Sequence, residues 1–198
     1  MPRRIKGTLM RLEDLELVVR NLRQVLEVLH NSGLEDRELR SKYAEFLVTK
    51  EIASRGYEVQ VLNEREVRSA DIYVPEIDKR IEVKSGLFKE ESGVITTDAS
   101  FGKGSQIRKR KFDVCVFVAF NGINPEFYVF TLEELLEVGE NERVNIADHP
   151  DTNPCLLILC KSYEDYMNYL RNEKMLNIEI DLHKNPEKYK DRWDKIFS

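Results

Sequence analysis

Apolar residues near the start of the chain follow a helical pattern. Between Leu12 and Leu29, leucine and valine recur at alternating spacings of three and four residues, as in a coiled-coil seam. The pattern predicts an amphipathic helix that ends at about Gly33, a residue suited to the left-handed position after a helix. About three heptads are marginal for an isolated coiled coil. The seam must therefore pack either on a second copy of the helix or on the body of the domain.

The next apolar patterns predict a second helix and a series of strands. The helix is expected from about Asp36 to Arg55, and Gly56 ends it. Strands are predicted where apolar residues alternate or run together, at 57–61, 70–74, 79–84, 111–120, 127–130 and 156–159. The strand at 111–120 is apolar enough to be central in a sheet and covered on both faces.

The second half of the chain adds helices to these strands. Thr131 can cap a short helix, because Glu134 three positions later completes a capping box. We expect a loop at 145–153, a helix at 163–175, and a short strand with a charged helix within 178–198. The side chains available to dock this last helix are Trp193, Ile196 and Phe197. The element order predicts an α/β fold in which helices flank a central mixed sheet.

The composition is typical of a globular domain rather than of a membrane protein. The longest apolar runs, 114–120 and 155–160, are far shorter than the roughly 20 residues of a spanning helix. The first residues do not form a secretory signal, so we expect a cytoplasmic protein without a membrane partner. The cysteines, which lie inside apolar runs and lack the spacing of a zinc site, are interpreted as reduced core residues: Cys115, Cys155 and Cys160.

The charge distribution leaves room for a local contact with nucleic acid. A net charge of −5 argues against a protein that coats nucleic acid, because such binding neutralises phosphates. One strip is basic and contains no acid, with Lys103, Arg108, Lys109, Arg110 and Lys111 within nine positions. The strip suggests a docking surface, although a solvated charge run is the commoner origin of such a pattern.

Two acidic residues are expected to face each other across a hairpin. If 75–78 forms a four-residue loop, Val74 pairs with Lys79, and counting along the ladder places Asp71 opposite Glu82. Two carboxylates held this close destabilise a sheet unless something neutralises them. A divalent cation could do so, and Mg²⁺ takes only one or two protein carboxylates.

Two further residues fit beside this pair. Lys84 lies on the same face of its strand as Glu82, since side chains alternate along a strand. It could orient or deprotonate a water, or offset developing negative charge. Glu45 lies at helical offsets from Val48 and Ile52, at the border of the stripe that packs on the sheet. A surface acid paired with Lys42 or Lys50 explains Glu45 equally well.

Asp71, ten intervening residues and then Glu82-Val83-Lys84 resemble the motif of the PD-(D/E)xK phosphodiesterase superfamily of restriction-endonuclease-like nucleases. The resemblance covers roughly residues 41–130, and Ala70 stands where the family name has proline. It implies a restriction-endonuclease-like core whose first helix carries an acid, here Glu45, as a third acid of the active site and a further metal ligand. It also implies Mg²⁺, which Mn²⁺ can replace, bound by Asp71, Glu82 and the main-chain carbonyl of Val83, with Lys84 as catalytic lysine.

The resemblance extends to the segment after the lysine strand. In similar family members this segment supplies a polar residue near the site, a place taken here by Ser105 and Gln106. Gln106 is equally well explained as a solvent-facing residue. If the nuclease hypothesis is correct, the basic strip together with Ser105 and Gln106 forms the expected DNA contact.

The sequence therefore predicts a metal-dependent DNA endonuclease of the restriction type, without an organic cofactor and acting as a homodimer. A structure-specific repair nuclease or Holliday junction resolvase fits the same residues. A domain that keeps the fold but only binds nucleic acid or a protein is the alternative of another class. The expected organisation is a helical arm at 1–33, a nuclease core at 34–175 and a docked extension at 176–198.

Overall fold

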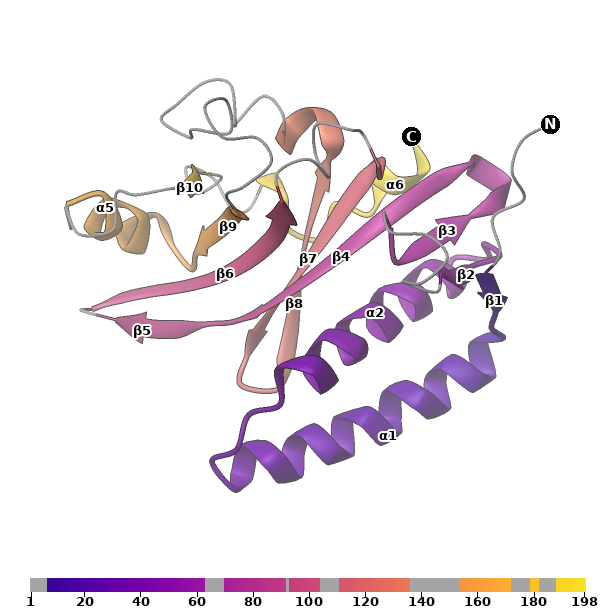
Figure 1. The fold of residues 1–198 in the computed structure, drawn as a ribbon, viewed down its shortest axis with the longest axis horizontal. Helices are drawn as coiled ribbons and strands as arrows, with labels where there is room; N and C mark the ends of the chain where they lie inside the picture. The colour runs from indigo at the N-terminus through magenta and orange to yellow at the C-terminus, as the bar shows by residue number, and fades with distance from the viewer. Residues whose placement is uncertain are drawn as a thin grey trace.

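The part of the chain that the structure describes folds into two sheets and flanking helices (Figure 1). The structure, a computed structural model, describes residues 7–62, 70–91, 93–103, 111–135, 154–171, 179–181 and 188–198. The predicted loop at 145–153 and the predicted helical residues beyond 171 lie outside these ranges. In the described part of the chain, no helix is both long and apolar enough to cross a membrane.

The larger sheet has six strands and is mixed. In spatial order they are β1 (Gly7–Leu9), β2 (Gln60–Leu62), β3 (Ile72–Val74), β4 (Lys79–Leu87), β7 (Val114–Asn121) and β8 (Asn124–Thr131). β4 and β7 are parallel, whereas the other neighbours are antiparallel. With helices packed on it, this sheet confirms the predicted fold class.

β2 is shorter and begins later than the strand predicted at 57–61. Side chains, rather than a neighbouring strand, hold the residues before it: the Tyr57 ring stacks on Phe197 at 4.4 Å between centroids. The Glu58 N–H donates to the Glu76 carboxylate at 3.0 Å. β1, which the sequence did not predict, adds an edge strand by pairing Gly7 with Leu62.

The smaller sheet has four strands in the order β10-β9-β6-β5. Its strands are β5 (Lys89–Glu91), β6 (Val94–Lys103), β9 (Pro154–Cys160) and β10 (Glu179–Asp181), with α5 (Tyr163–Arg171) beside them (Figure 1). β9 confirms the strand predicted at 156–159. β6 was not predicted, because its threonine, aspartate, alanine and serine residues lack an apolar alternation.

The helical arm packs within its own chain. α2 (Arg37–Ala53) lies between α1 (Leu12–Asn31) and the larger sheet (Figure 1). On the seam of α1, Leu15 and Val19 are buried. Val19 belongs to a core cluster that also contains residues of α2 and the larger sheet, and Leu22 and Leu26 pack on that cluster. The seam therefore packs in cis, the second of the two arrangements that the sequence allowed. Gly33 ends the arm with φ +68°, as predicted.

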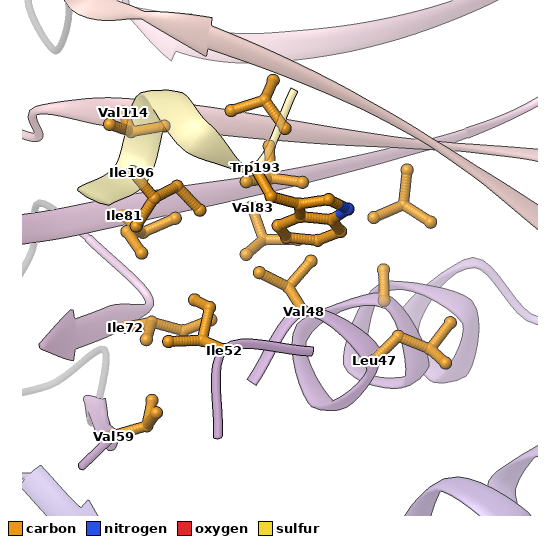
Figure 2. Close-up of a cluster of buried hydrophobic side chains, with 14 of the residues drawn as sticks. Leu47, Val48, Ile52, Val59, Ile72, Ile81, Val83, Val114, Trp193 and Ile196 are labelled. Carbon is orange, nitrogen blue, oxygen red and sulfur yellow. The ribbon is translucent and has the colours of Figure 1, made fainter. Parts of the chain in front are cut away.

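A hydrophobic cluster joins α2, the sheet and the end of the chain. Figure 2 shows Val48 and Ile52 of α2 beside Ile81 and Val83 of β4. The indole of Trp193 enters the same cluster. α6 (Asp194–Phe197) follows directly and buries Ile196, so the described end of the chain packs into this cluster. Since α2 takes the Ile81 and Val83 face of β4, Glu82 and Lys84 project to the opposite face.

β7 is buried along both faces, as predicted for a central strand. Val114, Val116 and Val118 belong to the cluster that includes α2. Cys115 and Phe117 belong to a second cluster on the other face. Among the described residues, the thiols of Cys115 and Cys160 are buried and form no disulfide, in agreement with the prediction of reduced core cysteines.

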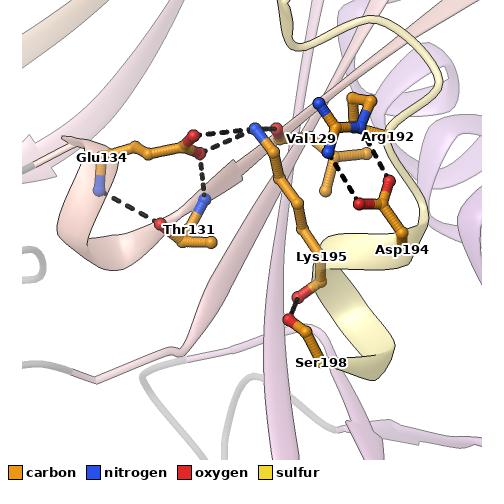
Figure 3. Close-up of polar contacts among 7 residues, drawn as sticks. All are labelled: Val129, Thr131, Glu134, Arg192, Asp194, Lys195 and Ser198. Atoms are coloured by element: carbon orange, nitrogen blue, oxygen red, sulfur yellow. Dashed lines mark hydrogen bonds and ion pairs between the residues drawn. The ribbon is translucent and has the colours of Figure 1, made fainter.

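A polar network fixes the C-terminal helix to the end of β8 (Figure 3). The Glu134 N–H donates to Thr131 Oγ1 at 3.1 Å, and the Thr131 N–H donates to the Glu134 carboxylate at 3.0 Å. This is the predicted capping box. Lys195 Nζ donates to the same carboxylate at 2.9 Å and to the Val129 carbonyl at 3.1 Å. A helix cap is thereby linked to α6 across the fold.

Candidate active site

The β3–β4 hairpin has the register that the sequence predicted. Val74 pairs with Lys79, and a single turn of 3₁₀ helix, η1 (Pro75–Ile77), with Asp78 joins the strands. Asp78 adopts φ +51°, a left-handed conformation that aspartate tolerates. The ladder extends to the pair of Ile72 with Ile81, and Asp71 lies just before β3, near Glu82 of β4.

Backbone and side-chain hydrogen bonds hold Asp71 at the start of β3. Its N–H donates to the Ile81 carbonyl at 3.0 Å, and its carbonyl accepts from the Leu62 N–H at 2.8 Å. Its carboxylate oxygen Oδ2 accepts from the Val83 N–H at 2.7 Å. The Asp71 side chain is thus turned toward the β4 backbone beside Glu82.

Glu82 and Lys84 form an ion pair on one face of β4. The Glu82 residue is only 5% exposed, and its Oε1 accepts a hydrogen bond from Lys84 Nζ. In the parallel ladder, Cys115 lies beside Glu82 and Phe117 lies beside Lys84. These neighbours belong to the second core cluster, so the polar groups sit at the edge of an apolar environment.

The electrostatics of Asp71 are those of a crowded acidic site. Burial, together with the negative charge of Glu82, raises the pKa of Asp71 to about 7. The Val83 N–H and the ammonium groups of Lys84 and Lys42 act in the opposite direction. The carboxyl groups of Asp71 and Glu82 are therefore close enough to repel each other, and the Val83 N–H and the two lysines do not fully offset the combined effect of burial and repulsion on the pKa of Asp71.

Lys84 remains a cation in this site. Burial lowers its pKa, but the charge and hydrogen bond of Glu82, with the charge of Asp71, more than offset that effect and raise the pKa of Lys84 above its usual value. Near it, burial and the charge of Glu82 raise the pKa of the Cys115 thiol, which is therefore neutral. In this state Lys84 can supply positive charge but cannot accept a proton.

Glu45 is buried and paired, but it does not join the two facing acids. It is 7% exposed, and both of its carboxylate oxygens accept from Lys42 Nζ, at 3.0 and 2.9 Å. Among the described residues, no three acidic, histidine or cysteine side chains converge on one metal position. The reason is that α2 packs on the face of β4 opposite to Glu82. Lys42 is near enough for its charge to lower the pKa of Asp71.

Most residues predicted to contact DNA fall outside the described ranges. Ser105, Gln106, Arg108, Lys109 and Arg110 are among them. Lys103 ends β6, and Lys111 is half-buried just before β7. The structure therefore leaves this surface as a prediction.

Three residues near the site were not assigned to it from the sequence. Lys42 was noted only as a partner for Glu45, although its position three residues earlier was the available signal. Cys115 reaches Glu82 through a parallel pairing that no local pattern encodes. Thr97 lies on β6, the strand that the sequence did not predict.

Comparison with known proteins adds one distant likeness. No family model matches the chain, and no curated protein matches it. Among solved structures, a bacterial homing endonuclease is 23% identical over 50% of this chain and 68% of its own, with a TM-score of 0.38. A likeness of this extent establishes neither a family nor a function for this chain.

Proposed function

We propose that this chain is a metal-dependent DNA endonuclease that hydrolyses phosphodiester bonds, with Asp71, Glu82 and Lys84 as its working residues. The observation that carries the proposal is the closeness of two carboxylates, on Asp71 and on the buried Glu82, beside the ammonium group of Lys84. Burial and the Glu82 charge raise the pKa of Asp71 to about 7, which signals an arrangement that is unfavourable without a further cation.

The donor set suits a hard divalent cation. Asp71 and Glu82 offer carboxylate oxygens, and Mg²⁺ or Mn²⁺ takes oxygen ligands while keeping sites for water and phosphate. The main-chain carbonyl of Val83 is the third ligand that the motif implies. When bound, the ion would polarise a phosphodiester and lower the pKa of its bound water. The proposal does not require Glu45 as a ligand.

The chain's own residues have separate tasks in this scheme. Lys84, whose raised pKa keeps its ammonium group charged, would bind a phosphate oxygen and offset the charge that develops during hydrolysis. The Lys42–Glu45 pair would place a second cation near Asp71. The basic strip at 103–111, with Ser105 and Gln106, would contact the DNA backbone.

The proposed homodimer needs a surface other than the α1 seam, which is already packed on its own chain. The outer side of α1 exposes Leu17, Val25 and Val28, with exposed fractions of 47%, 49% and 65%. A restriction-type cutter and a junction resolvase would both act on two strands, which suits a two-fold dimer.

Cleavage of a panel of DNA substrates tests the proposal. Linear, supercoiled, branched and single-stranded DNA would be incubated with wild-type protein and with Asp71→Asn, in Mg²⁺ and in EDTA. We expect cleavage by the wild type in Mg²⁺ only, and the preferred substrate separates the restriction-type and resolvase readings. Metal-independent cleavage would contradict the proposed metal requirement. DNA binding without cleavage under all conditions would contradict the proposal and favour the non-catalytic alternative.

A further inference from the structure

The row of side chains on the Glu82 face of β4 is completed by a residue from another strand. Glu82, Lys84 and Gly86 alternate onto this face. A Cβ at Gly86 would lie 2.2 Å from Thr97 Oγ1 and 2.5 Å from the Asp98 carbonyl oxygen. Glycine is therefore required where β6 crosses β4. The Thr97 hydroxyl occupies the place where a side chain of residue 86 would begin.

The Thr97 hydroxyl is buried without a hydrogen bond. Thr97 is 2% exposed, and its Oγ1 has no hydrogen-bond partner in the part of the chain that the structure describes. A hydroxyl in this position lowers stability relative to a methyl group of the same shape, because it loses water and gains no partner. A bond formed in another state of the protein would account for a hydroxyl here.

Lys84 is the group placed to form that bond. Neighbouring positions on one face of a strand are about 7 Å apart. Glu82 lies one such step from Lys84 in one direction, and the Thr97 hydroxyl lies one step away in the other. Lys84 Nζ already spans the distance to Glu82. The same flexible side chain can therefore span the distance to Thr97.

We propose that Thr97 is a positioning residue whose hydroxyl oxygen accepts a hydrogen bond from Lys84 Nζ when Glu82 is engaged elsewhere. The Lys84 ammonium group then has two alternative hydrogen-bond acceptors: Glu82 in this structure, and Thr97 when Glu82 is engaged elsewhere. The role in catalysis rests on the proposed function, in which Glu82 turns from Lys84 to the cation. The alternative hydrogen bond from Lys84 to Thr97 rests on the close approach of β6 to β4 and not on the proposed function.

A thermal double-mutant cycle in metal-free buffer tests the hydrogen bond from Lys84 to Thr97 without an activity assay. Thr97→Val in the wild-type background should leave the melting temperature unchanged or raise it. Glu82→Leu removes the carboxylate that accepts from Lys84, so adding Thr97→Val to this variant should lower the melting temperature by about 2–4 °C. An equal effect of Thr97→Val in both backgrounds would overturn the inference. If Glu82→Leu does not fold, Glu82→Gln replaces it in the cycle.

Kinetics test the catalytic part. Thr97→Val should lower kcat roughly 10- to 100-fold with little change in KM, and Thr97→Ser, which keeps the hydroxyl, should restore it. The matched control is Thr96→Val, one position away on the opposite face of β6. An unchanged kcat in an active Thr97→Val enzyme overturns the positioning role. Absence of cleavage by the wild type, together with the expected thermal coupling, contradicts the proposed function but supports the hydrogen bond from Lys84 to Thr97.

Discussion

Asp71, just before β3, lies near Glu82 of β4, but the two carboxylates are held in different ways. Asp71 accepts a hydrogen bond from the Val83 N–H, whereas Glu82 is paired with Lys84. Removing the Asp71 charge should therefore relieve repulsion. Removing Glu82 should instead leave the half-buried Lys84 without this counterion, which is destabilising.

The pH dependence of stability should reveal the strained state of Asp71. The pKa of Asp71 is about 7 when folded, against an ordinary value of 3.8. Because the folded state holds its proton more tightly, the metal-free wild type should lose stability as the pH rises from about 4 to about 7, and then level off. We expect Asp71→Asn to lack this slope and to be more stable at pH 8 by on the order of 2 kcal/mol.

Urea denaturation of both proteins in EDTA, at half-unit steps of pH, measures this difference. Coincident stability curves for wild type and Asp71→Asn would show that Asp71 titrates normally.

Replacement of Lys84 should separate activity from folding. Lys84→Ala should reduce the rate of DNA cleavage at saturating Mg²⁺ by about 100-fold or more, since it removes the positive charge beside the reacting phosphate. The matched control is Lys79→Ala, on the same strand but the opposite face, which should retain its rate. Single-turnover assays with circular dichroism as a check on folding make the comparison. Equal rates for the two variants would remove Lys84 from the mechanism.

Gly86 should tolerate no side chain. In Gly86→Ala the new Cβ would approach the Asp98 carbonyl oxygen to 2.5 Å, so β4 and β6 must separate. We expect a loss of about 1–3 kcal/mol in the free energy of unfolding. Ser85→Ala, on the opposite face of β4, is the control and should change stability by less than about 0.5 kcal/mol. Chemical denaturation measures both variants, and a neutral Gly86→Ala would mean that the strands cross with more space than this structure shows.

The helix cap at Thr131 should contribute measurably to stability. Thr131→Ala removes the acceptor of the Glu134 N–H and should cost about 1 kcal/mol in thermal or urea unfolding. The exposed Ser198→Ala, at the edge of the same network in Figure 3, should have no effect. Similar results for the two variants would assign the stability of this corner to the Lys195–Glu134 ion pair instead.

Local patterns predicted the parts of the site that lie close in the sequence. The four residues from Pro75 to Asp78 set the hairpin register, and strand alternation then placed Asp71, Glu82 and Lys84. The helix ends at Gly33 and Gly56 and the capping box at Thr131 were likewise predicted, because each depends on the conformation of a few neighbouring residues.

Contacts between distant segments could not be predicted in this way. The parallel pairing of β4 with β7 brings Cys115 beside Glu82, and the crossing of β6 brings Thr97 over Gly86. Both depend on how whole strands assemble. Glu45 shows the same limit, because helical spacing placed it at the sheet but did not reveal which face of β4 the helix covers.

The most direct test is to titrate Mn²⁺ into the metal-free protein and follow the free ion by electron paramagnetic resonance. The account expects one ion bound per chain, with binding lost in Asp71→Asn and Glu82→Gln and retained in Lys84→Ala. Absence of Mn²⁺ binding by the wild type, or undiminished binding by Asp71→Asn, would contradict it.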